Sequence, residues 1–319
     1  MIVFRDPAEV PSGFGPSVVA IGKFDGVHSG HRAVIDRARV DAATGDARIV
    51  AVTFDRNPLA LLRPEICPDA LIGVNQKLRL LADTGIDATL LLTFDRALAD
   101  LTPREFVQHV LVDALDVRVV LVGGDFRFGR GGSGDPDALR AFGSEFGFEV
   151  EVVEDVRAIE GGRRVSSTWV RELLDAGDVA TAARLLGRPP AVWGEVVHGL
   201  KRGRELGYPT ANLSPELEGF IPADGVYAGW LVDEGSTDGL RPGIRYAAAI
   251  SVGTNPTFGD VPVRQVEAYV LDETDLDLYG HRVEVQFTHR VRGMVAFEGI
   301  DALIVQMGDD VEKVRKALT

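Results

Sequence analysis

Two histidines in a glycine-rich segment are the first residues whose types and spacing could carry out chemistry. The segment 22–31 reads Gly-Lys-Phe-Asp-Gly-Val-His-Ser-Gly-His, so the histidines are His28 and His31. Glycines let the backbone turn sharply and approach a ligand closely. A helix is expected to follow directly, and the free amides at a helix N-terminus attract anions. The two imidazoles are therefore candidates to bind phosphate oxygens and the charge that develops on a leaving pyrophosphate.

A second glycine-rich segment lies in the C-terminal half and is strongly basic. It lacks the Gly-Lys-Ser/Thr sequence of a Walker A loop, and its spacing predicts a flexible cationic clamp for phosphates. Thr210 and Asn212 close the segment with neutral oxygens that suit Mg²⁺ shared with phosphates and water. The candidate phosphate-binding residues of the clamp are Gly199, Lys201, Arg202, Gly203, Arg204 and Gly207.

Short β-branched runs alternate with helical patterns through the first half of the chain. This rhythm predicts an α/β fold with a doubly wound parallel sheet. Ligands of such sheets bind beyond the carboxyl ends of the strands, so segments 22–31, 53–58 and 123–134 should lie around one crevice. Strands are expected at 18–21, 49–54, 88–94, 117–122 and 149–153, and helices at 32–40, 76–84, 103–111 and 137–146.

The pattern of predicted elements changes after two further predicted helices, 167–174 and 179–186. Gly-Arg-Pro-Pro at 187–190 is the best linker candidate, which predicts domains 1–186 and 187–319. The second domain is expected to be a small antiparallel β-barrel, closed by an amphipathic helix over 300–318. Its strands are expected at 192–197, 225–232, 246–252, 263–271 and 281–288.

The strand predicted over 263–271 contains a carboxylate. By the alternation of a strand, Glu267 shares a face with Gln265 and Tyr269, opposite the apolar residues between them. Taken alone, a glutamate in the middle of a strand is more often a solvated outer residue.

The segment 22–31 resembles the signature of the nucleotidyltransferase superfamily. In its Phe-Asp-Gly form it is similar to the adenylyltransferase half of bacterial riboflavin kinase/FAD synthetases. The resemblance implies a second motif, a Ser/Thr pair that opens a later helix and is followed by arginine, although Ser-Ser-Thr at 166–168 alone would suit an ordinary helix cap. The ATP-binding residues that the resemblance implies, besides the two histidines, are Gly22, Phe24, Asp25, Gly26, Gly30, Arg164, Ser167, Thr168 and Arg171.

The same resemblance implies where a flavin would bind. The segment 123–129 looks like the family's flavin-side loop, and the segment after the second strand offers further packing. There the family usually has a Pro-His-Pro turn, whereas this chain reads Phe-Asp-Arg-Asn-Pro at 54–58. The flavin-binding residues implied in this half are Phe54, Pro58, Asp125, Phe126, Arg127 and Phe128.

With Pro-Thr-Ala-Asn at 209–212, the basic segment resembles the riboflavin kinase signature. The resemblance implies that Glu267 is the catalytic carboxylate, that Arg292 contacts the flavin, and that the loop 253–258 lies near the substrates. The chain departs from the family pattern at 291–297. Where the family often has an acidic and a basic residue, this chain has Met294 and Ala296.

These features together predict a bifunctional enzyme of flavin cofactor biosynthesis. The C-terminal domain would transfer the γ-phosphate of MgATP to riboflavin, and the N-terminal domain would join FMN to the α-phosphate of a second ATP. Two alternatives stay open: a nucleotidyltransferase domain with a different substrate, or a catalytically silent flavin-binding regulator.

Two other patterns are not interpreted as sites. Gly-x-Gly-x-x-Gly at 129–134 is interpreted as a chance match, and the segment from 275, which resembles a calcium loop but lacks two ligands, is interpreted as a turn.

Composition limits the partners and the compartment. The 319 residues include 34 Lys and Arg against 48 Asp and Glu, a net charge of −14, which argues against nucleic-acid and anionic-membrane partners. No signal peptide or apolar span is apparent, so we expect a cytoplasmic protein that is a monomer or a weak homo-oligomer. Its single cysteine, Cys67, excludes an internal disulfide and a multi-cysteine zinc site. The expected partners are ATP, riboflavin and FMN, with Mg²⁺.

Overall fold

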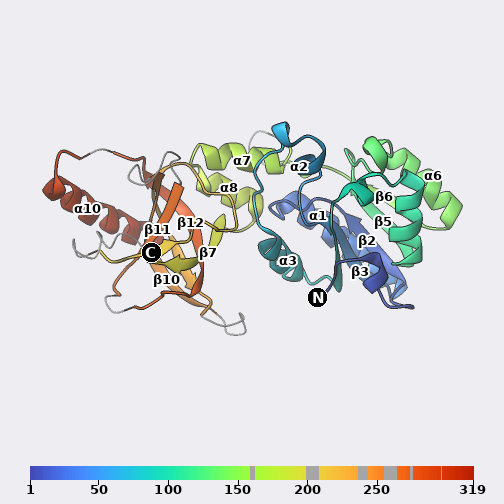
Figure 1. Cartoon of the computed structure of the whole chain (residues 1–319), viewed down its shortest axis with the longest axis horizontal. Coiled ribbons are helices and arrows are strands. Elements are labelled where there is room, and N and C mark those ends of the chain that lie inside the picture. The colour runs from blue at the N-terminus through green and yellow to red at the C-terminus, as the bar shows by residue number, and fades with distance from the viewer. Residues whose placement is uncertain (159–161, 199–207, 236–242, 255–263, 274–275, 296) are drawn as a thin grey trace. The chain divides into compact units, whose positions relative to one another are not determined.

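The chain contains two compact units, Met1–Ser166 and Ser167–Thr319. The computed structural model (Figure 1) describes all residues except 159–161, 199–207, 236–242, 255–263, 274–275 and 296. Among the described residues, no helix is both long enough and apolar enough to cross a bilayer.

The first unit is built on a six-stranded sheet in which every neighbouring pair is parallel. Its strand order is β1-β4-β3-β2-β5-β6, so the chain moves outward from β2 in one direction and then returns to β2's other side. The predicted doubly wound sheet is confirmed, and its switch point, where ligands bind in such folds, lies between β2 and β5. The strands are β1 (Ile2–Phe4), β2 (Ser17–Ile21), β3 (Arg48–Phe54), β4 (Ala88–Leu92), β5 (Val117–Gly123) and β6 (Glu149–Val153).

The four helices predicted for this unit are present with shifted ends, and the short helices at 59–62 and 96–99 were not predicted. The first helix begins at Ser29 rather than Arg32, and the helix expected over 103–111 is α-helical only to Phe106 before it continues as a π-helix, η3 (Val107–Asp113). The α-helices are α1 (Ser29–Gly45), α2 (Leu59–Leu62), α3 (Val74–Ala82), α4 (Arg96–Ala99), α5 (Pro103–Phe106) and α6 (Pro136–Phe146). Short 3₁₀ turns are η1 (Pro7–Glu9), η2 (Pro64–Ile66) and η4 (Arg130–Gly132).

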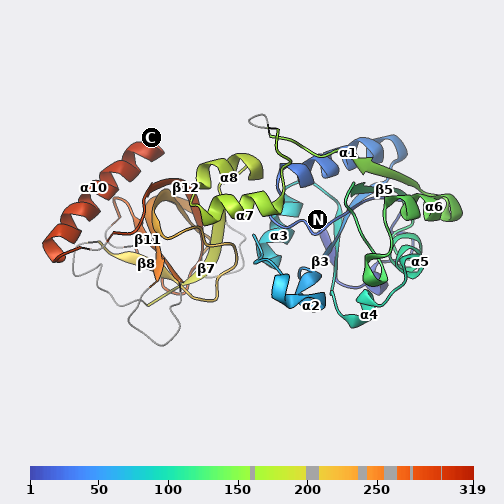
Figure 2. The same cartoon turned by 90° about the horizontal axis from the view of Figure 1, so that it is seen from above.

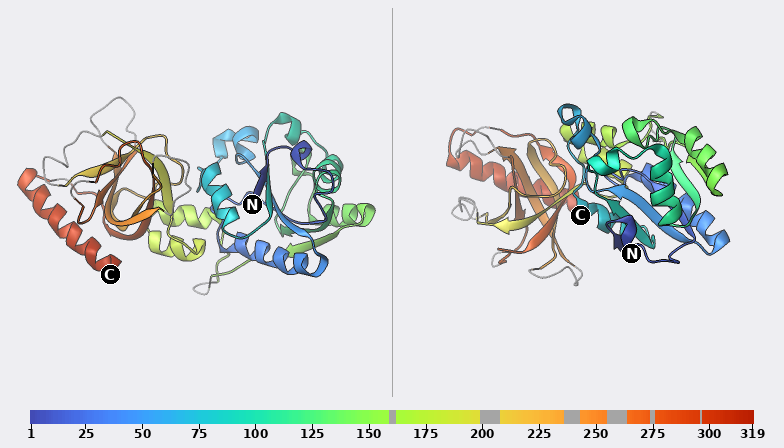
Figure 3. Two further views of the ribbon diagram at one scale, coloured as in Figure 1. Left: turned by 90° about the horizontal axis from the view of Figure 1, so that it is seen from below. Right: turned by 45° about the vertical axis from the view of Figure 1, so that its right-hand side comes forward.

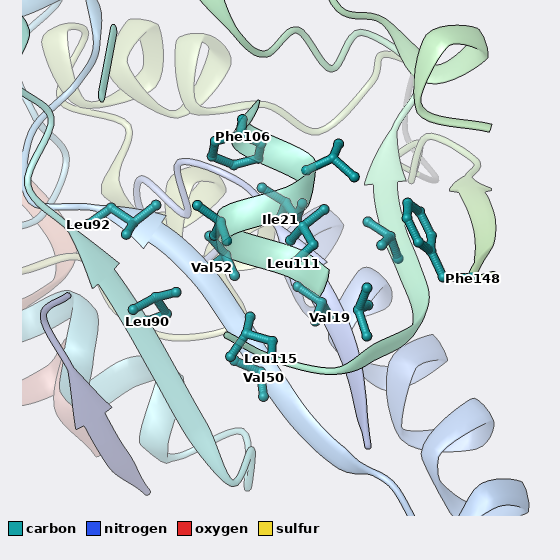
Figure 4. Packing of buried hydrophobic residues seen from close by; sticks show 14 of the residues in the cluster. Val19, Ile21, Val50, Val52, Leu90, Leu92, Phe106, Leu111, Leu115 and Phe148 are labelled. Carbon is teal, nitrogen blue, oxygen red and sulfur yellow. The ribbon is translucent and has the colours of Figure 1, made fainter. Parts of the chain in front are cut away.

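A large hydrophobic core of the first unit lies on one face of the sheet (Figure 4). Val19 and Ile21 of β2 pack there with Phe106, Leu111 and Leu115 from α5, η3 and the turn after it. All residues of β2 are buried, as expected for a central parallel strand covered on both faces. This packing holds the strand ends rigidly, and the loops that carry the candidate site begin at those ends.

The second unit contains a closed antiparallel barrel with strand order β10-β11-β8-β7-β12-β9 (Figure 2). The predicted barrel and closing helix are confirmed, and α10 (Ile300–Leu318) lies along the outside of the barrel (Figure 3). One strand, β8, was not predicted, because it has only four residues, Thr-Ala-Asn-Leu, and two of them are polar. The strands are β7 (Ala191–Val197), β8 (Thr210–Leu213), β9 (Gly225–Asp233), β10 (Ile244–Thr254), β11 (Arg264–Val270) and β12 (Arg282–Arg292).

Two short helices, α7 (Ser167–Asp175) and α8 (Val179–Leu186), belong to this second unit. The Arg290 guanidinium on β12 donates a hydrogen bond of 2.9 Å to the carbonyl of Ala176, just after α7. Gly177 has a φ of +77°, and a Cβ there would lie 2.7 Å from the guanidinium. The packing thus divides the chain at 166/167, twenty residues before the predicted domain boundary at 186/187. The predicted boundary concerns the two activities and stays a prediction.

Candidate active sites

The loop that follows β2 has an unusual backbone. Gly26 has a φ of +86°, which favours glycine, but Phe24 and Val27 also have positive φ, +49° and +41°. Such a conformation costs a β-branched residue about 1–3 kcal/mol, and it persists only where the surroundings enforce it. Here the side chains of Phe24 and Val27 are 1% and 0% exposed, and the Asp25 carboxylate accepts a hydrogen bond of 2.9 Å from the Leu71 amide. The loop is therefore fixed before any ligand arrives.

The two predicted histidines form a stacked pair at the start of α1. Their ring centroids are 3.7 Å apart with an angle of 16° between the planes. His28 is the N-cap of α1, and its Nδ1 accepts a hydrogen bond of 3.4 Å from the His31 amide. A Cβ at Gly30 would lie 3.1 Å from the His28 ring, so glycine makes room for the stack. The imidazoles thus stand at a helix N-terminus, where an anion is favoured.

His31 is held in its neutral form. Burial lowers the pKa of its imidazole well below the ordinary value, and the charges of His28, Lys77 and Arg164 lower this pKa further. Its Nδ1 is buried and has no hydrogen-bond partner among the residues that the structure describes. A neutral ring can still donate one hydrogen bond to a phosphate oxygen.

Arg164 links the region around His31 to residues that are distant in sequence. Its guanidinium pairs with Asp125 at 3.1 Å and with Asp155 at 3.0 Å, and the hydrogen bond to Asp125 raises the pKa of Arg164. Because the charge of Arg164 also acts on His31, the first unit gathers the histidines, Arg164 and Asp125 in one region beyond the strand ends.

Lys77 is a charged residue of this region that the sequence analysis did not identify. It lies on α3, is only 7% exposed, and donates a hydrogen bond of 2.8 Å from Nζ to the carbonyl oxygen of Phe54. One signal could have revealed it: Lys77 stands four residues before the buried Leu81, on the apolar face of α3.

The altered turn after β3 is stabilised by its own side chains. Asp55 accepts a hydrogen bond of 2.9 Å from the Phe94 amide, and Asn57 accepts one of 3.1 Å from the Leu59 amide. Phe54 is half-buried, with its ring 5.4 Å from that of Phe94 in an edge-to-face arrangement, and Pro58 is the N-cap of α2. Polar capping thus replaces the Pro-His-Pro turn while Phe54 and Pro58 stay partly accessible.

The predicted flavin-side loop has one accessible ring and one buried ring. Phe128 is 6% exposed and belongs to the core, where a Cβ at Gly134 would lie 2.6 Å from its ring. Phe126 is half-buried and stacks on Phe128, with 5.4 Å between centroids. Phe128 therefore supports Phe126 from behind, and a direct flavin contact stays a prediction for Phe126. The neighbouring Arg127 pairs with Asp135 at 3.3 Å.

The hydroxyl motif lies at the start of α7. Ser167 is its first residue, Thr168 follows, and Arg171 stands one turn later. All three belong to the second compact unit. Their predicted role in binding a triphosphate stays a prediction.

The barrel places Glu267 beside the two candidate metal ligands. In the sheet register Glu267 of β11 lies directly opposite Asn212 of β8, and Thr210 Oγ1 is 3.5 Å from Glu267 Oε2. Asn212 Nδ2 donates to the carbonyl oxygen of Thr210 at 3.1 Å and to its Oγ1 at 3.3 Å. Val266 and Ala268 are buried in the barrel, so Glu267 points to the opposite face, as predicted.

The environment of Glu267 makes it a better base than an ordinary glutamate. Burial raises the pKa of its carboxyl group, while the hydrogen bond from Thr210 acts in the opposite direction. A carboxylate whose pKa is nearer to the working pH accepts a proton more effectively.

Arg292 is engaged with α10 in this structure. Its Nη2 and Nε lie 2.7 Å and 2.8 Å from Oδ2 of Asp310, which is 4% exposed. The predicted flavin contact of Arg292 therefore stays a prediction, for a side chain that already has a structural partner. The predicted phosphate clamp lies outside the described residues, as do 255–258 and Ala296; its members are Gly199, Lys201, Arg202, Gly203, Arg204 and Gly207.

A histidine-bearing loop at the switch point of a parallel sheet, together with a barrel that sets a half-buried carboxylate beside Thr and Asn, defines a two-domain nucleotide-dependent transferase. The sequence model of the FAD synthetase family matches residues 11–169, and that of the riboflavin kinase family matches residues 186–318. The chain belongs to the family of bifunctional riboflavin kinase/FMN adenylyltransferases.

Relatives of this family resemble the chain along most of its length. The bifunctional riboflavin kinase/FMN adenylyltransferase of Escherichia coli (strain K12) is 37% identical over 92% of this chain and 90% of its own. That of Pseudomonas fluorescens is also 37% identical, over 93% of this chain and 92% of its own. That of Listeria monocytogenes is 33% identical. The predicted pair of activities is thereby confirmed, in preference to the two alternatives.

A solved structure supports the fold. A crystal structure described as that of a macrolide-efflux protein from Streptococcus pneumoniae matches with a TM-score of 0.83 and 32% identity, covering 98% of each chain. The predicted order of a parallel α/β domain and an antiparallel barrel is confirmed.

Proposed function

We propose that residues 187–319 phosphorylate riboflavin to FMN with MgATP, and that residues 1–186 adenylylate FMN to FAD with release of pyrophosphate. The observation that supports this most is the half-buried carboxylate of Glu267 beside Thr210 and Asn212, on the face of the barrel away from its core.

Phosphoryl transfer depends mostly on positioning and neutralisation of charge, with a base for the hydroxyl proton. Glu267 accepts the proton of the riboflavin 5′-hydroxyl while that oxygen attacks the γ-phosphorus of ATP and the bond to ADP breaks. The basic residues between Gly199 and Gly207 hold the ATP phosphates. Arg292 contacts the flavin from its position beside Asp310, with which its guanidinium is paired in the structure.

Neutral oxygens on β8 fit a magnesium ion. Among the described residues there is no group of three or more His, Cys, Asp or Glu side chains that could hold a metal. The Thr210 hydroxyl and the Asn212 amide oxygen would hold Mg²⁺ together with substrate phosphates, which is how proteins usually bind this ion. When bound, Mg²⁺ neutralises phosphate charge.

In adenylyl transfer the substrate supplies the nucleophile. A phosphate oxygen of FMN attacks the α-phosphorus of ATP, and the bond to the β-phosphate breaks. His28, His31, Arg164, Ser167, Thr168 and Arg171 bind the triphosphate, on the loop formed by Gly22, Phe24, Asp25, Gly26 and Gly30. Phe54, Pro58, Phe126, Asp125 and Arg127 line the flavin side, with Phe128 behind Phe126.

Product analysis tests this assignment. With riboflavin and MgATP we expect FMN to appear before FAD, and with FMN and MgATP we expect FAD and pyrophosphate in equal amounts. Excess EDTA should stop riboflavin phosphorylation. The assignment is wrong if chromatography shows riboflavin and FMN unchanged in the presence of MgATP.

A further inference from the structure

Lys77 is a cation in a buried position beside the end of β3. Its side chain is 7% exposed, and within the described part of the chain its ammonium donates one hydrogen bond, the 2.8 Å bond to Phe54. Burial lowers the pKa of Lys77, while Asp25 and Asp55 act in the opposite direction. A buried charge is costly unless it is compensated, and such groups are frequent at functional sites.

Two features of this position concern the adenylyltransferase site. Phe54 is the last residue of β3, so the bond from Lys77 fixes the point where the strand gives way to the turn at 55–58. The charge of Lys77 also acts on His31, whose Nδ1 is buried without a partner among the described residues.

Protonation of His31 would be doubly unfavourable. It would create a buried N–H donor at Nδ1 with no acceptor, which costs about 1–3 kcal/mol. It would also place a further positive charge beside two cations. In the neutral ring with Nδ1 unprotonated, Nε2 is the one N–H donor. The charged or titratable groups that act on His31 or Lys77 are His28, Arg164, Asp25 and Asp55, and Arg164 is itself paired with Asp125 and Asp155.

We propose that Lys77 is a positioning residue for adenylyl transfer, which holds the end of β3 through the Phe54 carbonyl and keeps His31 neutral, as a hydrogen-bond donor to phosphate. This inference rests on the proposed adenylylation of FMN. In it Lys77 acts through His31 and the backbone, and it forms no bond in the reaction.

Two measurements on the full chain test this role. The first is an NMR titration of the His31 imidazole in the wild type, Lys77→Met and Lys77→Arg. Removing the charge should move the His31 titration to higher pH, and Arg, which keeps the charge, should leave it near the wild-type position. Lys77→Gln, which removes the charge but keeps a hydrogen-bond donor, provides the same comparison if Lys77→Met is unfolded.

The second measurement is the pH dependence of kcat/KM for ATP in the adenylylation of FMN, which reports ionisation of the free enzyme. In Lys77→Met the acid limb should move to higher pH by the same shift that NMR records. Riboflavin phosphorylation by the same samples should keep its wild-type rate, which a general loss of structure would not allow.

The proposal is overturned if His31 titrates at the same pH in Lys77→Met and in the wild type. It is also overturned if the ring titration moves but the acid limb does not, because His31 neutrality would then not matter for the reaction. A wild-type protein that fails to adenylylate FMN would refute the proposed function instead, and the NMR titration would still decide whether Lys77 sets the charge of His31.

Discussion

Glu267 illustrates how burial can favour activity at the expense of stability at a single residue. Because burial raises the pKa of its carboxyl group, the native state holds this proton at a pH where the unfolded chain has lost it. The free energy of unfolding should therefore fall as pH rises from the ordinary glutamate pKa through the native one. Ionisation of Glu267, which the proposed kinase step requires, thus lowers the free energy of unfolding of the barrel.

Glu267→Gln should separate these two effects. The variant lacks the base, so we expect riboflavin phosphorylation to fall by a factor of about 100 or more. It also lacks the ionisation, so the free energy of unfolding in urea should fall less than that of the wild type as pH rises through the native pKa of Glu267. Glu284→Gln, on strand β12 of the same barrel, is the matched control and should keep kinase activity. A wild-type kinase rate in Glu267→Gln would remove this residue from its role.

The sequence predicted some candidate site residues, whereas another candidate, Lys77, became visible only in the structure. His28 and His31 stand in a pattern that is improbable outside a functional site, whereas the role of Glu267 was implied only by the resemblance to riboflavin kinases. Lys77 has no such pattern, because a lysine on a helix is ordinary and only the tertiary packing shows that this one is buried. Phe128 was grouped with Phe126 by its motif, and only the tertiary packing shows that its ring lies in the core.

At the scale of elements, α10 is fixed to the barrel by a buried ion pair as well as by apolar packing. Val314 and Val311 pack against barrel residues, and Arg292 pairs with Asp310 at 2.7 Å. The apolar spacing of this helix was visible in the sequence, but the burial of Asp310 was not. Elements of only a few residues were likewise missed: β1 and β8 form because neighbouring strands offer them hydrogen-bond partners.

A double-mutant cycle tests this attachment. The side chains of Arg292 and Asp310 are 17% and 5% exposed, and removing one member of a buried pair costs about 3 kcal/mol. We expect Arg292→Met and Asp310→Asn each to lower the free energy of unfolding by this amount, and the double variant to lose much less than the sum. The exposed pair Arg315–Asp272 is the control and should show little coupling. Additive losses at Arg292 and Asp310 would contradict the structural role.

At the scale of the whole molecule, the order of the two folds was predictable because their rhythms differ. Alternating strands and helices require a parallel sheet, whereas closely spaced strands with turns favour an antiparallel barrel. The grouping of 167–186 with the barrel was not predictable, since it depends on contacts such as that from Arg290 to Ala176. The chain thus belongs to a family with two activities, and we propose that the histidines of the first unit and Glu267 of the second serve them separately.

Mixing two inactivated variants tests that separation most directly. Given riboflavin and MgATP, His28→Ala should stop at FMN, and Glu267→Gln should leave riboflavin nearly unchanged. Mixed together, they should produce FAD, because FMN released by the first is a substrate for the second. If His28→Ala loses both activities while folded, or if the mixture makes no FAD although each variant keeps its remaining activity, the account of two separate sites on one chain is wrong.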